Sequence, residues 1–155
     1  MGVLIDTGIF FGFYSKNDIQ HNNSVALIIH ALQGKWGRPY ISDHILDETI
    51  NILKYKISEE IALEFIRAFI ISKNVEVIVS DLKIIDKALE LFKQEYKLKG
   101  FSLTDAISIT LMQEFNIEYM LTFDRVLGKF VKIIGPNYIE TLSKRELEMI
   151  KRYLK

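Results

Sequence analysis

The chain has 155 residues, and its 20 Lys and Arg balance its 20 Asp and Glu, so the formal net charge is zero. This length suits one domain, and a hydrophobic content of 49% excludes an intrinsically disordered chain. The absence of cysteine excludes disulfides, iron–sulfur clusters and thiolate zinc sites, and suits a reducing cytosol. No apolar run reaches the roughly 18 residues of a membrane span, and the first residues lack the basic start of a signal peptide. We therefore expect a cytoplasmic protein with no membrane association, and zero net charge argues at first against a nucleic-acid partner.

Short β-branched runs alternate with helical patterns along the first half of the chain. Apolar residues at alternating or helical spacing, with turn and capping residues between them, define the elements. The expected elements are a strand at 3–5, a helix at 9–14, a polar loop at 15–20, a helix at 23–33, a strand stub at 40–41, a helix at 43–56 begun by Ser42 or Asp43, and a helix at 59–71 begun by Ser58.

The second half continues the same alternation. The expected elements are a strand at 75–79, a helix at 80–96 begun by Ser80, a helix at 102–115, strands at 119–122 and 131–134, and a helix from Ser143 to Tyr153. Strands separated by helices predict an α/β fold with a mainly parallel sheet. We expect one domain over residues 1–155, in which 143–155 form a helical tail.

Two acidic residues follow expected strands directly. Asp6 ends the first strand, and Asp124 comes just after the strand at 119–122. Ligands of open α/β sheets bind beyond the carboxyl ends of the strands, so if these two strands are neighbours, both carboxylates face one crevice. Each acid has a structural alternative: Asp6 as a helix cap, and Asp124 as the start of a turn toward Gly128.

Asp105 lies in a helix that is apolar nearly all round. It shares a face with Ile109 and Met112, which is expected to be buried. An unpaired buried carboxylate costs several kcal/mol, so a bound cation or a helix N-terminus must compensate its charge. The alternative is a capping box in which Ser102 and Asp105 bond each other's backbone.

Glu48 lies at the edge of the buried face of its helix, close to Ile52. This position suits a carboxylate that reaches over the rim of a cleft. An ordinary solvated glutamate is the alternative that helical geometry alone favours.

The four acids together resemble a known series of motifs. The segments are Val3-Leu4-Ile5-Asp6-Thr7, then Glu48 in a helix after a strand stub, then Leu103-Thr104-Asp105-Ala106, then Leu121-Thr122-Phe123-Asp124. Their order and spacing are similar to those of PIN-domain nucleases, in particular the small prokaryotic proteins that act as VapC-type toxins. The resemblance covers about residues 3–135. It implies a three-layer α/β/α fold, and it implies roles for six residues: Asp6, Glu48, Asp105 and Asp124 as catalytic, metal-binding carboxylates, with Thr7 and Thr122 as their hydroxyl neighbours.

The resemblance also implies an activity and partners. These are Mg²⁺- or Mn²⁺-dependent endonucleolytic cleavage of single-stranded RNA, a homodimer, and an antitoxin that blocks the cleft. The residue chemistry agrees with the cation, because Mg²⁺ and Mn²⁺ prefer oxygen ligands and only three scattered histidines are present. The chain departs from the pattern at Gly8, where many members carry Asn or Ser, and at Thr110-Leu111, where smaller residues are common.

Other functions remain open on the sequence. One is a catalytically weak PIN-like domain that binds RNA or a protein, with structural acids; a phosphatase with an aspartyl nucleophile lacks its second aspartate after Asp6. Trp36, flanked by Lys35 and Arg38, suits either base stacking or local packing, and His30 suits a structural role.

Residues 144–155 hold five basic and two acidic residues. Zero net charge therefore averages a basic tail with an acidic remainder and does not exclude nucleic acid.

Overall fold

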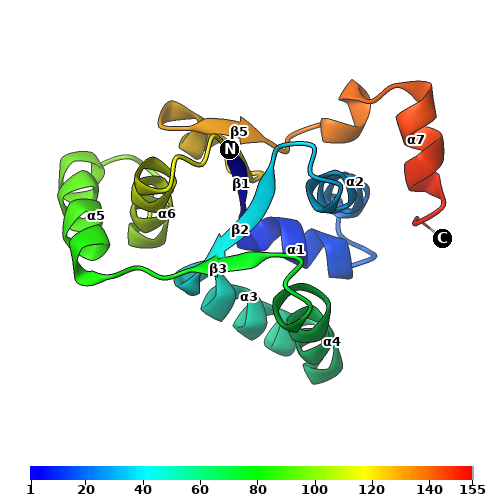
Figure 1. Ribbon diagram of the computed structural model, residues 1–155, viewed down its shortest axis with the longest axis horizontal. Coiled ribbons are helices and arrows are strands. Elements are labelled where there is room, and N and C mark those ends of the chain that lie inside the picture. The colour runs from blue at the N-terminus through cyan, green and yellow to red at the C-terminus, as the bar shows by residue number, and fades with distance from the viewer. Residues whose placement is uncertain (155) are drawn as a thin grey trace.

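Parallel strands form the central sheet of the computed structural model, which describes residues 1–154 (Figure 1). The strands are β1 (Gly2–Ile5), β2 (Arg38–Ser42), β3 (Glu76–Ile78), β4 (Tyr119–Leu121) and β5 (Lys132–Ile134). They lie in the order β3-β2-β1-β4-β5, and each neighbouring pair is parallel. The chain moves outward from β1 to β3 and then returns to the other side of β1. The carboxyl ends of β1 and β4 therefore flank the point where the strand order reverses.

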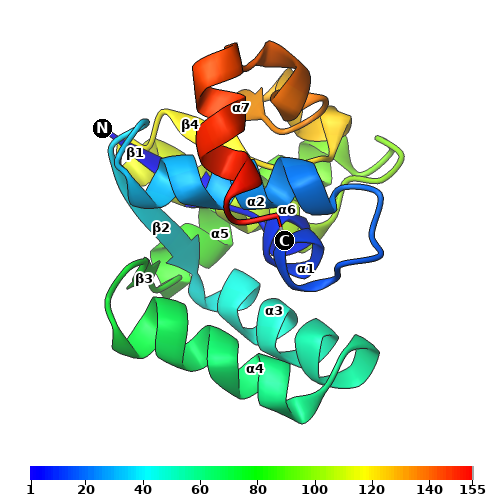
Figure 2. The same cartoon turned by 90° about the vertical axis from the view of Figure 1, so that its right-hand side faces the viewer.

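Helices cover both faces of this sheet. They are α1 (Thr7–Tyr14), α2 (His21–Leu32), α3 (Asp43–Lys56), α4 (Glu59–Phe65), α5 (Leu82–Glu95), α6 (Leu103–Glu114) and α7 (Lys144–Lys151), with a π-helical segment η1 (Ile66–Ile71) and 3₁₀ turns η2 (Arg125–Lys129) and η3 (Tyr138–Thr141). The pair α5 and α6 lies on one side of the sheet, and α1 and α2 lie on the other (Figure 1). Figure 2 shows α3 and α4 as an adjacent pair below α1 and α2. The predicted three-layer α/β/α fold is confirmed.

The core lies on both sides of β1. Val3, Leu4 and Ile5 are completely buried, as expected of a central parallel strand with helices on each face. The phenylalanine rings of α1 and α4 extend this core, with Phe10 edge-on to Phe65 at 4.9 Å between ring centroids. No helix within residues 1–154 is long and apolar enough to cross a membrane.

Several boundaries differ from the prediction because tertiary contacts decide them. The strand stub at 40–41 is a five-residue strand, since β2 pairs with β1 on one side and β3 on the other. The helix predicted from residue 80 begins at Leu82. Asp81, rather than Ser80, caps it by accepting a hydrogen bond from the backbone N–H of Ile84 (2.9 Å). Ser80 instead donates its hydroxyl to Asp43 Oδ1 (2.7 Å), which ties the end of β3 to the start of α3. The helix predicted at 59–71 becomes π-helical from Ile66.

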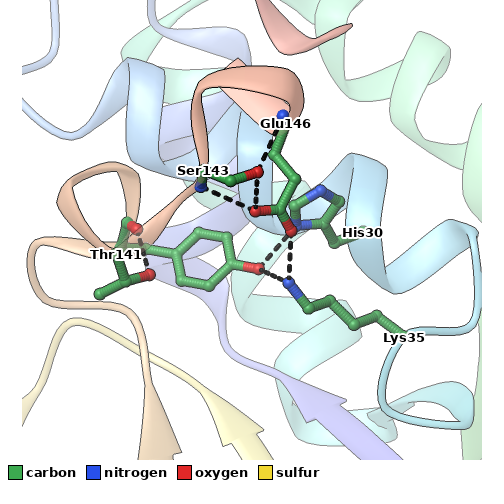
Figure 3. A network of polar contacts seen from close by, with 6 residues as sticks. His30, Lys35, Thr141, Ser143 and Glu146 are labelled. Atoms are coloured by element: carbon green, nitrogen blue, oxygen red, sulfur yellow. Dashed lines mark hydrogen bonds and ion pairs between the residues drawn. The ribbon is translucent and has the colours of Figure 1, made fainter. Parts of the chain in front are cut away.

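A polar network fastens the C-terminal helix to the rest of the fold (Figure 3). The predicted pair of Ser143 and Glu146 forms a capping box at the start of α7. Glu146 Oε1 accepts from Lys35 Nζ (3.2 Å), and Lys35 Nζ also donates to Tyr138 Oη (3.1 Å). Tyr138 Oη lies 2.6 Å from Nδ1 of the buried His30. The structural role predicted for His30 is confirmed, and α7 is anchored to α2.

Trp36 belongs to the same cluster. Its ring lies edge-on to Tyr138 and His30, with centroid distances of 5.7 and 6.3 Å. Of the two roles left open by the sequence, the structure shows local packing.

Candidate active site

A pocket of about 490 Å³ opens at the carboxyl edge of the sheet. The starts of α1 and α6, the middle of α3 and the turn after β4 line it. All four predicted acids lie in this lining: Asp6, Glu48, Asp105 and Asp124. Among the residues described by the structure, no Lys, Arg or His lines the pocket. It therefore concentrates negative charge with no basic side chain to balance it.

Asp6 both caps a helix and faces this pocket. Its Oδ1 accepts a hydrogen bond from the backbone N–H of Thr7 (2.9 Å), which starts α1 at Thr7 rather than at residue 9. Its Oδ2 accepts from the hydroxyl of Thr122 (2.7 Å). Burial raises the pKa of Asp6 to about 6; the two hydrogen bonds oppose this rise, and repulsion from Asp105 and Glu48 adds to it. The capping alternative is thus correct, but it does not remove the carboxylate from the pocket.

Asp105 has the same double character. Its Oδ2 accepts from the backbone N–H of Ser102 (2.9 Å), and its own N–H donates to Ser102 Oγ (3.1 Å), so the capping box is complete. Burial raises the pKa of Asp105; the bonds from Ser102 oppose this, and Asp124 adds repulsion. The helix N-terminus therefore supplies part of the positive potential that the sequence requires.

Glu48 reaches from α3 toward α1. Its Oε2 accepts from the hydroxyl of Thr7 (3.1 Å), and Thr7 Oγ1 accepts in turn from the hydroxyl of Thr49 (3.2 Å). Thr49 is completely buried, whereas Glu48 is exposed. The chain of hydroxyls thus directs an exposed carboxylate into the pocket, so Glu48 is not simply solvated. Asp47, its neighbour on α3, accepts instead from Asn51 Nδ2 at the surface (3.1 Å).

Thr122 connects the two acids at the strand ends. Its buried hydroxyl donates to Asp6 and accepts from the backbone N–H of Asp124 (3.1 Å). Asp124 Oδ1 accepts from the N–H of Val126 (3.0 Å), so Asp124 opens the turn η2, as its alternative proposed, and still lines the pocket. Thr7 and Thr122 are therefore both hydroxyl neighbours of the predicted acids.

The donor atoms suit a hard divalent cation. The pocket offers carboxylate and hydroxyl oxygens and neither thiolate nor imidazole, which favours Mg²⁺ or Mn²⁺ over zinc. Three acids keep one oxygen without a hydrogen bond to any of residues 1–154: Glu48 Oε1, Asp105 Oδ1 and Asp124 Oδ2. Across the described chain no three such side chains are already grouped at metal-binding spacing. Carboxylates repel one another when no cation lies between them, so binding requires side-chain rotation.

Sequence reasoning missed two kinds of residue here. Thr49 is one, because nothing in its own surroundings indicates a partner 42 residues away. Phe11 and Ile52, which also line the pocket, are the other. Each lies four residues after a predicted site residue on the same helix, Thr7 or Glu48, and that spacing was a usable signal.

Comparisons with known proteins agree with this geometry. The family model of the PIN domain matches residues 3–133. The chain is 42% identical over 155 residues to a VapC ribonuclease of Archaeoglobus fulgidus, covering 100% of this chain and 96% of that relative. Among solved structures, Mycobacterium tuberculosis VapC20, a toxin that cleaves the sarcin–ricin loop, superimposes with a TM-score of 0.74 at 21% identity, over 87% of this chain and all of that one. A toxin–antitoxin complex from Klebsiella pneumoniae gives a TM-score of 0.61 at 21% identity, covering 87% of this chain and 98% of that one. At this identity the two structures support the fold alone.

Proposed function

This chain belongs to the PIN domain family, and we propose that it is a metal-dependent endoribonuclease that acts as the toxin of a toxin–antitoxin pair. One observation carries the proposal: a pocket at the carboxyl edge of a parallel sheet holds four carboxylates and, within the described residues, no basic side chain. A phosphodiester is an anion, so it enters such a pocket only if cations are bound there first. The relative named as a ribonuclease, 42% identical over the whole chain, supports RNA as the substrate.

In this proposal Asp6, Glu48, Asp105 and Asp124 hold Mg²⁺ or Mn²⁺ and are the catalytic carboxylates. The bound ions would neutralise phosphate oxygens, acidify an attacking water and stabilise the leaving oxygen. The protein's part is to position the acids. Thr122 holds Asp6 against the backbone of Asp124, and Thr7 holds Glu48 across the space between α1 and α3. A bound cation would supply the positive charge that Asp6 lacks, and it would favour the ionised form of this buried acid, whose pKa burial raises.

The proposal includes partners and organisation. We expect an antitoxin protein that covers the pocket, as the similarity to a VapC ribonuclease implies. We further propose a homodimer in the cytoplasm. Residues 1–155 would act as one nuclease domain. Of its predicted tail at 143–155, residue 155 lies outside the described residues, and α7 is held on α2 by the network around Tyr138.

The competing function is a binding domain whose acids are structural. One observation favours it: Asp6, Asp105 and Asp124 each accept a backbone hydrogen bond at the start of a helix or turn. This function predicts RNA or protein binding without cleavage.

A cleavage assay with matched variants separates the two. RNA is incubated with the protein in Mn²⁺ and then in excess EDTA, alongside Asp6→Asn and, as the control, Asp47→Asn. Asp47 is an exposed acid of α3 outside the pocket. We expect cleavage in Mn²⁺ by the wild type and the control only. Cleavage that survives EDTA, or that Asp6→Asn leaves intact, would refute the proposed function.

A further inference from the structure

The pocket has an apolar end as well as an acidic one. Thr7 and Glu48 occupy the acidic end, and each has an apolar residue four positions later on its helix: Phe11 on α1 and Ile52 on α3. Residues four apart lie on the same face of a helix, about one turn of 5.4 Å further along the axis. Because α1 and α3 pack against each other below the ends of β1 and β2 (Figure 1), the two apolar side chains line one region next to the carboxylates.

Phe11 differs from the other phenylalanines of its helix. Phe10 is completely buried and packs on Phe65, while Phe13 packs on Tyr14 and Phe69. Phe11 is only half-buried and lines the pocket. Within residues 1–154 its ring pairs with no other aromatic ring. Its ring therefore packs against the hydrophobic core without an aromatic partner in the described part of the chain.

We propose that Phe11, with Ile52 beside it, forms a stacking subsite for a nucleobase next to the phosphodiester held at the carboxylates. This inference rests on the proposed function, since the acidic end places the phosphate. One helical turn is comparable with the distance from the phosphate to the base of a nucleotide. A pocket of about 490 Å³ is within the range that accommodates small ligands. A base is neutral and has a π-face whatever its identity, so stacking suits the two apolar side chains of this lining, Phe11 and Ile52.

The substitution that tests this is Phe11→Leu, which keeps an apolar side chain but removes the ring. Phe13→Leu is the matched control: it is the same change on the same helix, but Phe13 lines a different cavity, between α2 and the C-terminal residues. Equal thermal stability of the two variants establishes that any difference between them does not come from folding.

The first assay is cleavage. A short RNA around one mapped cleavage site is compared with versions that lack the base at each flanking nucleotide. We expect Phe11→Leu to lower kcat/KM about tenfold on the intact RNA and hardly at all on one of the abasic versions. For the wild type, kcat/KM should be lower on that abasic RNA than on the intact RNA by the same factor of about ten. The inference would be overturned if Phe11→Leu lowered kcat/KM by the same factor on intact and abasic RNA, or if Phe13→Leu lowered it as much as Phe11→Leu does. Either result would leave the proposed function in place.

The second assay is binding, which does not require activity. Labelled oligoadenylate and a fully abasic backbone of the same length are titrated onto wild type and both variants in Ca²⁺. We expect Phe11→Leu to weaken binding of oligoadenylate about tenfold and to leave binding of the abasic backbone unchanged. If no RNA is cleaved in Mn²⁺ but this difference is present, the nuclease proposal fails and the stacking subsite stands. If the variant binds oligoadenylate as wild type does, the subsite is refuted.

Discussion

Replacing Asp6 by Asn should stabilise the metal-free protein while abolishing its response to Mn²⁺. The carboxyl of Asp6 has a pKa of about 6 in the fold against an ordinary 3.8, because burial disfavours its charged form. An acid whose pKa is raised by folding binds more protons in the native than in the unfolded state between these two values. Stability therefore falls as pH rises through them, and the loss is complete above about pH 6. Asn carries no charge and avoids this loss.

The magnitude follows from the pKa and from the hydrogen bonds. A rise from 3.8 to about 6 corresponds to about 3 kcal/mol at neutral pH. Asn keeps an oxygen that can accept from the N–H of Thr7. Its NH₂ group, however, replaces the oxygen that accepts from the hydroxyl of Thr122 in the wild type, so this hydroxyl loses its acceptor. That lost bond costs about 1 kcal/mol. The net gain is about 2 kcal/mol, or about 4–8 °C in melting temperature for a domain of this size.

Urea unfolding in EDTA measures this gain at about pH 7.5 and again near pH 4. Near pH 4 Asp6 is protonated in the native wild type, so the gain should disappear and leave at most the cost of the lost hydrogen bond, about 1 kcal/mol. Asp47→Asn serves as the control and should change stability by less than about 0.5 kcal/mol at either pH. Added Mn²⁺ should then raise the melting temperature of wild type and of the control but not of Asp6→Asn. A gain that is absent, or that is equal at both pH values, would refute the argument that burial of the Asp6 charge opposes folding.

Three further substitutions test other parts of the structure. Thr49→Val keeps the shape of a buried side chain but removes the hydroxyl that donates to Thr7. Titration calorimetry should show weaker Mn²⁺ binding in this variant and restored binding in Thr49→Ser. Unchanged affinity in Thr49→Val would contradict the positioning of Glu48 by these hydroxyls. Tyr138→Phe leaves Nδ1 of the buried His30 without its hydrogen-bond partner and should lower the free energy of unfolding in urea by about 2 kcal/mol. The same change at the exposed Tyr153 should leave this free energy almost unchanged. Equal effects of the two substitutions would argue against the network. Gly135→Ala places a methyl group against the backbone carbonyl of Thr122 and should cost about 2 kcal/mol or more. Gly8→Ala makes only an ordinary contact with Cδ2 of Phe123 at 4.0 Å and should be tolerated. Comparing the two variants by denaturation tests the close approach of β5 to Thr122.

Two of the four acids were predictable because they contradict their local pattern, whereas Asp124 was indicated by its place after a strand and Glu48 only by the resemblance to the motif series. Asp6 ends a fully apolar strand, and Asp105 interrupts a helix that is apolar nearly all round. Such exceptions require a compensating partner, so they identify candidate site residues without a structure. For both residues, capping and a position in the pocket proved compatible, because one carboxylate oxygen satisfies the helix and the group as a whole still faces the pocket.

The features that could not be predicted depend on distant partners. Ser80 and Asp81 are both good helix caps, and only the bond from Ser80 to Asp43 leaves Asp81 to begin α5. The strand at Arg38–Ser42 contains Pro39 and has polar ends, so its length comes from the strands beside it and not from its own propensity. Local pattern carries no information about such partners.

Because β1 lies between β2 and β4, the candidate active site cannot be complete during protein synthesis until β4 has been made. The hydroxyl of Thr122 bonds Asp6 across 116 residues of sequence, and β4 must pair with β1 before that contact forms. A nascent chain with only the first three strands has Asp6 and Glu48 but neither Asp105 nor Asp124, and the carboxyl edge of its sheet is open on one side. Under the proposed function, the ribosome that makes this protein is not exposed to a complete nuclease until β4 and Asp124 have emerged.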